Sequence, residues 1–320
     1  ADHGAWLGST VFDGARFFDG VIPDLEAHCE RVNRSARALM LTPTVSTSAM
    51  VEIVREGLAS FASGSAVYIR PMYWGIDGDP TAIVPSPEAT GFAICLEEVA
   101  MPPAEKSVRL TRTQFRRPVL EDAVVNAKAG CLYPNNARML VEARRRGFDN
   151  ALVADAMGNV AETATANIFM VKDGEIFTPI PNGTFLAGIT RARHMVNLAA
   201  DGTPVREAVL SFADFAQADE VFMTGTMSKI TPVTEFDGTH YQIGPVARRT
   251  REMYWDGAWS VAVSCILGQI IFSCQTSRWK LWISAPKILR MRSRLPYWRR
   301  PRGGFRRLRS RRYCREMGGT

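Results

Sequence analysis

The chain has 320 residues, 46% of them hydrophobic and 22% charged, which is ordinary for a globular protein and long enough for two domains. The formal net charge of +7 is unevenly distributed, since residues 261–320 carry +14 and the first 260 residues carry −7. The longest apolar run, Val261–Phe272, is too short to span a bilayer, and no signal peptide opens the chain. We therefore expect an acidic, cytoplasmic body with no membrane partner and a separate basic tail.

The six cysteines, at positions 29, 95, 131, 265, 274 and 314, form no CxxC pair and no metal-ligand spacing with the four histidines. Reduced thiols in a cytoplasmic protein without a metal site are the interpretation that fits this pattern.

The first 117 residues predict a small mixed α/β unit. Ser9–Phe18 reads as a strand with a bend at Gly14, and Asp24 is placed to cap a helix over Leu25–Met40. Arg31 lies off the apolar stripe of that helix and is expected to be free to reach a ligand. The remaining elements are a helix over Ser48–Phe61 and strands over Ala66–Trp74, Gly91–Val99 and Val108–Phe115.

Residues 118–260 predict a larger second unit after a linker at Arg117-Pro118. A helix over Pro134–Arg146 ends at Gly147, and Asp173-Gly174 and Asp237-Gly238 are hairpin turns. The other predicted elements are strands at Ala151–Asp155, Val160–Thr163, Asn167–Lys172, Glu175–Thr178, Glu220–Thr224, Ile230–Phe236 and His240–Ile243 and helices at Thr190–Ala200 and Pro245–Trp259.

Lys128 lies among small or apolar neighbours, with Tyr133 five residues later. Such a setting lowers the pKa of an amine by desolvation and leaves it able to attack a carbonyl. Taken alone, the segment favours a surface lysine in a loop, and the case for chemistry needs the rest of the chain.

Three further features fit a phosphorylated aromatic cofactor. Gly188-Ile189-Thr190-Arg191 enters a helix where free N–H groups bind anions, and Gly225-Thr226-Met227-Ser228 is a second donor-rich loop. Glu162 lies among small residues, and if its carboxylate is buried it needs a cationic partner, which a protonated ring nitrogen would supply. Each feature alone also fits a plain helix cap or an exposed strand acid.

Together the motifs resemble the class IV, or branched-chain, family of pyridoxal-phosphate-dependent aminotransferases. The resemblance covers nearly all of residues 1–258, and its motifs stand in the family's order. They are GSTVFDGARFFDG, AHCERVNRSA, AVYIRP, NAKAGCLY, ARRRGFDNALVAD, GNVAETATANIF, FLAGITRAR, ADEVFMTGTMSKITPV and GPVARRTREMY.

The resemblance implies a two-domain α/β fold with pyridoxal 5'-phosphate between the domains. Lys128 would form the Schiff base and move the proton, Tyr133 would bind the phenolic oxygen, and Glu162 would keep the ring nitrogen protonated. The phosphate would be held by Arg31, Ile189, Thr190 and Thr226.

For the substrate, the resemblance implies a pocket formed by Phe12, Tyr68, Arg70, Met227 and Ser228. Its aromatic walls would favour an apolar side chain, and Arg70 and backbone amides would receive a carboxylate. The implied reaction is transamination of leucine, isoleucine and valine with 2-oxoglutarate or glutamate, in a homodimer or higher oligomer.

One departure from the family leaves other reactions open. Leu7 stands where branched-chain enzymes commonly carry a tyrosine, which removes one donor to the substrate carboxylate. The same scaffold serves D-amino-acid transaminases, (R)-selective amine transaminases and aminodeoxychorismate lyase.

The two ends also depart from the family pattern. The chain begins inside the family's first conserved block, so one or two leading strands are expected to be missing. Residues 261–320 read as a disordered or frameshifted segment. The alternatives are a basic arm for nucleic acid or a membrane surface, which we rank lower, and a catalytically silent product of a damaged gene.

Overall fold

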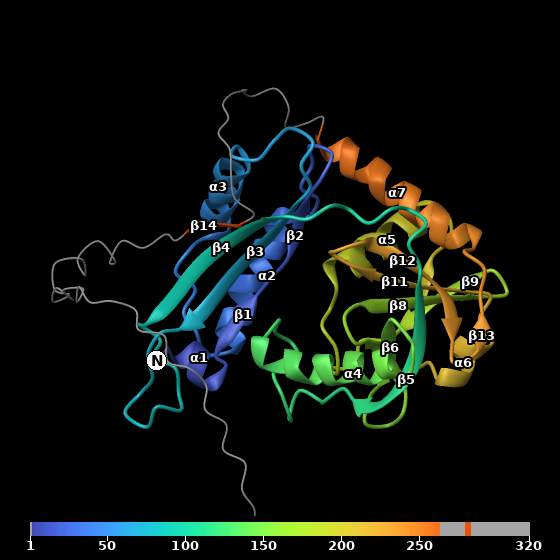
Figure 1. Ribbon diagram of the computed structural model, residues 1–320, viewed down its shortest axis with the longest axis horizontal. Coiled ribbons are helices and arrows are strands. Elements are labelled where there is room, and N and C mark those ends of the chain that lie inside the picture. Colours follow the sequence, from blue (N-terminus) through green and yellow to red (C-terminus); the bar gives the residue numbers. More distant parts are fainter. Residues whose placement is uncertain (1, 263–278, 283–320) are drawn as a thin grey trace, which may run out of the picture. The chain divides into compact units, whose positions relative to one another are not determined.

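The computed structural model describes residues 2–262 and 279–282 (Figure 1). The expectations for the basic tail and for its disorder therefore lie almost wholly outside the described residues. The described chain forms two β-sheets, one of five strands and one of nine, with helices packed on both.

The five-stranded sheet is antiparallel and follows the order β1-β3-β4-β14, with β2 also paired to β3. The predicted strand over Ser9–Phe18 divides at Asp13-Gly14, where a Cβ on Gly14 would lie 2.4 Å from the Tyr68 hydroxyl. The strands are β1 Thr10–Phe12, β2 Ala15–Phe17, β3 Val67–Gly75, β4 Thr90–Glu98 and β14 Trp279–Trp282.

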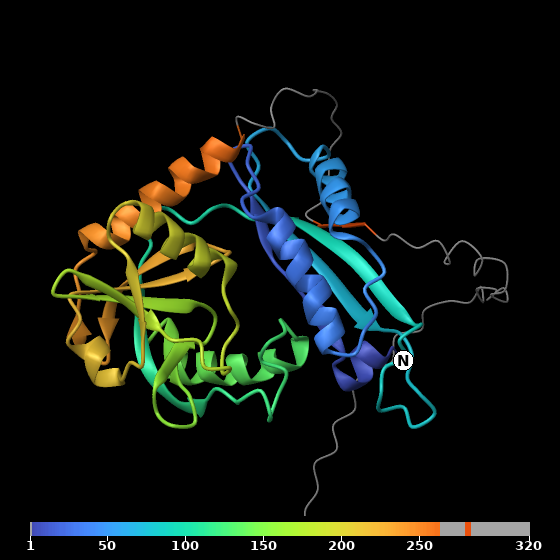
Figure 2. The ribbon, with the colours of Figure 1, turned by 180° about the vertical axis from the view of Figure 1, so that it is seen from behind.

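Helices α2 (Leu25–Ala38) and α3 (Thr47–Leu58) pack on this sheet, and Figure 2 shows α2 running along it. The apolar stripe predicted for α2 is buried in the core. Asp24 is the N-cap residue of α2, as predicted, but its side chain caps no N–H group and instead binds Arg193 Nε at 2.9 and 2.8 Å. A tertiary ion pair thus outweighs the local cap. A short helix, α1 (His3–Leu7), was not predicted.

The nine-stranded sheet follows the order β10-β9-β8-β11-β12-β5-β6-β7, with β13 beside β12. Its parallel pairs are β10 with β9, β12 with β5, and β5 with β6. The strands are β5 Val108–Arg116, β6 Asn150–Ala154, β7 Val160–Thr163, β8 Asn167–Lys172, β9 Glu175–Pro179, β10 Val205–Ala208, β11 Glu220–Gly225, β12 Lys229–Phe236 and β13 Thr239–His240.

Strand β5 belongs to this second sheet, so its predicted membership of the first unit is wrong. The chain passes from one sheet to the other between Glu98 and Val108, before the predicted linker at Arg117-Pro118. Strand propensity located β5 correctly in the sequence. Which of the two sheets β5 joins is determined by its pairing with β6 and β12.

Four helices cover the nine-stranded sheet: α4 Tyr133–Arg145, α5 Ile189–Ala200, α6 Phe212–Ala216 and α7 Pro245–Ala262. Helices α5 and α7 pack on the face that carries Phe169 and Phe222. Helix α4 packs on Ala151 and Val153 of β6. Figure 1 shows α7 and α4 at opposite borders of this part of the molecule.

Both predicted hairpin turns are confirmed by their backbone angles. Asp173 and Gly174 have φ of 51° and 79°, and Asp237 and Gly238 have φ of 46° and 91°, the left-handed pairs that two-residue hairpins require. Elements β10 and α6 were missed by the sequence analysis. Within the described ranges, no helix combines the length and apolar character needed to cross a bilayer.

Candidate cofactor and substrate site

A cavity of about 620 Å³ is lined by residues from both sheets. All twelve residues predicted from the sequence line it, although their individual roles stay predictions. They are Phe12, Arg31, Tyr68, Arg70, Lys128, Tyr133, Glu162, Ile189, Thr190, Thr226, Met227 and Ser228.

The segment around Lys128 is fixed by backbone hydrogen bonds. The amide of Lys128 donates to Ser35 Oγ at 3.1 Å, and its carbonyl accepts from the amide of Phe12 at 3.1 Å. The Lys128 side chain is partly buried, with Nζ 5.5 Å from the centroid of the Phe12 ring. Burial lowers the pKa of Lys128, although the negative charge of Asp13 opposes the shift. The amine is therefore biased toward its neutral, nucleophilic form.

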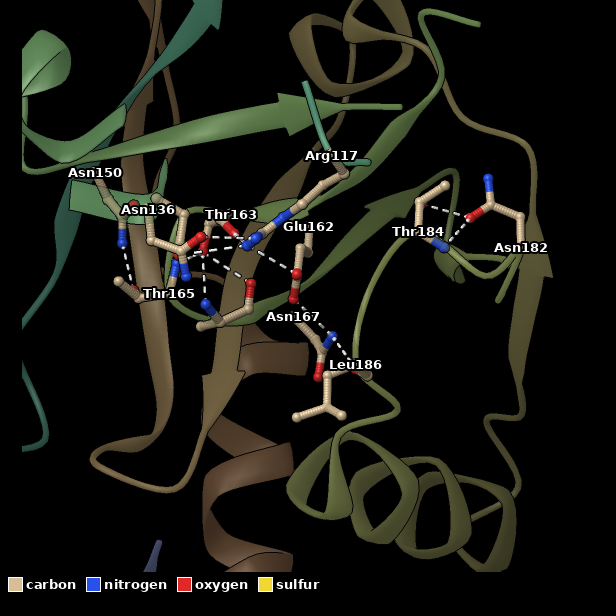
Figure 3. A network of polar contacts seen from close by, with 12 residues as sticks. Arg117, Asn136, Asn150, Glu162, Thr163, Thr165, Asn167, Asn182, Thr184 and Leu186 are labelled. Atoms are coloured by element: carbon tan, nitrogen blue, oxygen red, sulfur yellow. Dashed lines mark hydrogen bonds and ion pairs between the residues drawn. The ribbon is translucent and has the colours of Figure 1, made fainter. Parts of the chain in front are cut away.

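Glu162 of β7 is buried beside an arginine (Figure 3). Its Oε1 lies 2.8 Å from Arg117 Nη2, and its Oε2 accepts from Asn167 Nδ2 at 3.3 Å. Burial raises the pKa of Glu162 to about 6, against the opposing charges of Arg117 and Lys128. The sequence analysis expected a ring nitrogen as the partner of this acid and missed Arg117, which it placed in a linker.

Arg117 makes further contacts of its own, as Figure 3 shows. It donates to Asn136 Oδ1 at 2.8 Å and to the carbonyl of Thr163 at 3.1 Å. This arginine therefore fixes the carboxylate of Glu162 at one place in the cavity wall.

Tyr133 begins α4, and its ring centroid lies 4.9 Å from that of Phe12. Burial, together with the negative charges of Glu162 and Asp13, raises the pKa of Tyr133 to about 12. The phenol stays protonated at neutral pH and can donate a hydrogen bond into the cavity.

Arg31 is engaged by protein groups, so the expectation that it is free is wrong. Its guanidinium binds both carboxylate oxygens of Asp13 and donates through Nη1 to the carbonyl of Ala187 at 2.9 Å. Asp13 also binds Nδ1 of His28 at 2.7 Å. Asp13 and His28 had no distinguishing sequence signal, because their contacts form only in the folded chain. Arg31 still lines the cavity and has five N–H donors in total.

The N-terminus of α5 supplies further donors. Gly188 is its N-cap residue and has no side chain to bind the first N–H groups, which also lack intrahelical acceptors. A Cβ on Gly188 would lie 1.9 Å from Asn167 Oδ1, so the position requires glycine. The turn of Thr226 and Ser228 between β11 and β12 lines the same cavity.

The wall to which the sequence analysis assigned the substrate is formed by residues of β1 and β3. The Arg70 guanidinium carbon lies 5.5 Å from the Phe12 ring centroid and 5.1 Å from that of Tyr68. Leu7, the departure from the family pattern, is 44% exposed in α1 and is not among the lining residues.

The residues present fit pyridoxal phosphate. A buried acid, a low-pKa amine and a helix N-terminus match its ring nitrogen, its aldehyde and its phosphate, respectively. Three lining residues, Arg70, Arg117 and Thr224, each hold a buried polar atom without a protein hydrogen bond, so the wall keeps spare donors.

A family model described as Amino-transferase class IV matches residues 10–236. A putative branched-chain-amino-acid aminotransferase from Methanocaldococcus jannaschii is 33% identical over 261 residues, which are 80% of this chain and 89% of that protein. The branched-chain-amino-acid aminotransferase of Escherichia coli K12 is 31% identical over 79% of this chain and 85% of its own.

Among solved structures, an aminotransferase from Brucella abortus bound to PLP is similar with a TM-score of 0.80 and 54% identity, over 81% of this chain and 92% of that chain. The branched-chain amino acid aminotransferase of Escherichia coli is similar with a TM-score of 0.76 and 29% identity, over 80% of this chain and 88% of that chain. These findings confirm the predicted resemblance, the mixed α/β fold and pyridoxal phosphate as the cofactor. The chain belongs to the class IV aminotransferase family.

Proposed function

We propose that this aminotransferase transfers the amino group of leucine, isoleucine and valine to 2-oxoglutarate, with Lys128 attaching pyridoxal phosphate covalently. The observation that carries the proposal is that the twelve residues assigned to the site from the sequence, which lie between positions 12 and 228, line one cavity. The branched-chain substrate is supported by the names of the relatives in Methanocaldococcus jannaschii and Escherichia coli.

Pyridoxal phosphate, when bound, supplies an electron sink for negative charge at the substrate carbon. Glu162, fixed by Arg117, presents a carboxylate to the ring nitrogen and keeps it protonated. Tyr133 donates to the phenolic oxygen. The phosphate is received by Arg31, the first N–H groups of α5 at Ile189 and Thr190, and Thr226.

Lys128 also acts as the base and acid of the reaction. Because burial lowers its pKa, the amine is able to accept a proton from the substrate α-carbon and to deliver it to the carbon on the other side of the amino nitrogen, a 1,3-shift. The Phe12 ring, 5.5 Å from Nζ, keeps one side of the amine away from water and from competing hydrogen bonds.

The substrate enters between the aromatic wall and the turn after β11. Phe12 and Tyr68 offer apolar surface to a branched side chain, and backbone amides near Met227 and Ser228 receive the carboxylate. Arg70, held over the two rings, receives the second carboxylate of glutamate.

Half-reaction spectra test this proposal. L-Leucine is expected to convert the yellow holoenzyme to the amine form of the cofactor, while D-alanine and (R)-1-phenylethylamine do not, and Lys128→Ala loses the yellow form. Conversion by D-alanine or the amine instead would replace the branched-chain assignment. Pyruvate release from aminodeoxychorismate without an amino acceptor would show a lyase.

We also propose a cytoplasmic homodimer or higher homo-oligomer with two domains, whose boundary lies in residues 99–107, where the chain leaves the first sheet. Light scattering tests the oligomer, and limited proteolysis tests the boundary. A monomer, or cleavage confined to the region after Arg117, would contradict these assignments.

A further inference from the structure

Glu97 brings a carboxylate to the substrate wall that the proposed reaction does not use. It lies on β4 directly opposite Tyr68 of β3, and both residues line the cavity. Arg70 is two residues further along β3, so Glu97 is its diagonal cross-strand neighbour, within reach of long side chains.

Three other charged residues of the cavity already have protein partners, and Lys128 is assigned to the cofactor in the proposed function. Glu162 pairs with Arg117, and Arg31 pairs with Asp13. Within the part of the chain that the structure describes, neither Glu97 nor Arg70 forms a salt bridge, and the buried Nε of Arg70 has no hydrogen-bond partner. One wall therefore carries a positive and a negative charge, both available to a ligand.

We propose that Glu97 accepts the terminal ammonium of a cationic amino donor, so that the cavity takes amino acids with a side-chain amine in addition to apolar ones. The inference rests on the proposed function, since it assigns the same wall as the place of the substrate side chain. Arg70 receives a distal carboxylate and Glu97 a distal ammonium, while an apolar side chain uses only Phe12 and Tyr68.

The test compares L-ornithine with L-norleucine, which has nearly the same shape without the ammonium, in half-reactions of the wild type and Glu97→Gln. We expect the wild type to prefer ornithine, and Glu97→Gln to lower kcat/KM for ornithine about tenfold, as loss of one charge-assisted contact implies. The same substitution is expected to lower KM for glutamate, because it removes a negative charge near the γ-carboxylate.

Opposite changes for ornithine and glutamate distinguish a charge contact from structural damage, which would lower activity toward both substrates. Glu98→Gln is the matched control, since the next residue on β4 is exposed, points to the other face and binds Ser65 Oγ at 2.7 Å. Calorimetric binding of ornithine and norleucine to Lys128→Ala reconstituted with pyridoxal phosphate adds a readout without turnover.

Equal binding of ornithine and norleucine, or an ornithine preference that survives Glu97→Gln, would overturn the inference even if leucine is converted. If leucine is not converted but ornithine is preferred and this preference depends on Glu97, only the branched-chain assignment is overturned.

Discussion

Asp13 and Arg31 form a two-contact ion pair, with Arg31 Nε 2.6 Å from Asp13 Oδ2 and Nη2 2.8 Å from Oδ1. Both side chains are buried. Asp13 follows β1 and Arg31 lies in α2, while the third contact of Arg31 reaches the carbonyl of Ala187, just before α5. The pair therefore joins the helix on one sheet to the segment that leads into α5 on the other.

Asp13→Asn is expected to weaken cofactor binding tenfold or more and to lower the free energy of unfolding by about 3–5 kcal/mol, because Arg31 keeps a buried charge without its partner. Burial alone raises the pKa of Asp13, but Arg31 and His28 outweigh it and hold that pKa well below its usual range. Cofactor titration of the apoenzyme and urea unfolding measure the two effects.

The control for Asp13→Asn is Glu30→Gln, which breaks only an exposed pair with Arg34 at 3.8 Å and should cost less than about 1 kcal/mol. An unchanged cofactor dissociation constant in Asp13→Asn would show that Arg31 is positioned without this carboxylate.

Cofactor affinity is expected to fall as pH drops through about 6. The pKa of Glu162 in the apoprotein is about 6, so the carboxylate that pairs with the ring nitrogen is ionised above this pH and protonated below it. Glu162→Gln should abolish this dependence and reduce kcat by roughly 10²–10³-fold, the usual cost of removing one preorganised electrostatic contact. Fluorescence titrations of the apoenzyme between pH 5 and 8 measure the profile.

Arg117→Gln should move the same pH dependence upward, because Arg117 opposes the burial that raises the pKa of Glu162. Glu175→Gln, at an exposed strand end, is the control and should leave the profile unchanged. If the cofactor affinity of the wild type does not change between pH 5 and 8, cofactor binding does not depend on the charge of Glu162.

Lys229→Met is expected to stabilise the protein. Lys229 is fully buried, its Nζ has no hydrogen-bond partner, and its pKa is lowered to about 7, first by burial. Since the unfolded chain holds this proton up to about pH 10.4, stability rises with pH between about 7 and 10.4. The gain from Lys229→Met should therefore be largest at or below pH 7, about 2–4 kcal/mol, and shrink toward pH 10.

Denaturant unfolding at pH 6.5 and pH 9.5 measures this difference, with the exposed Lys106→Met as the control. A loss of stability in Lys229→Met at both values would mean that the contacts of the ammonium with the rings of Phe18 and Tyr254, whose centroids lie 5.9 and 5.3 Å from Nζ, offset the cost of its burial.

Local patterns in the sequence were sufficient for most elements. The spacing of apolar residues in α2 and the Asp-Gly turns at 173–174 and 237–238 act over a few residues, so they can be read without the fold. Lys128 and Glu162 differ, because their small or apolar neighbours also fit a surface lysine and an exposed acid, and the resemblance to a family was needed to select them.

Only the tertiary structure decided which groups partner one another. The sheet of β5, the ion pair that takes Asp24 away from its helix, and the contacts of Glu162 with Arg117 and of Arg31 with Asp13 all join residues far apart in the chain. Their energies depend on burial and on distances of about 3 Å, which no local pattern encodes. Propensity and motif spacing therefore indicate where reactive groups lie, while packing sets their charge state and their partners.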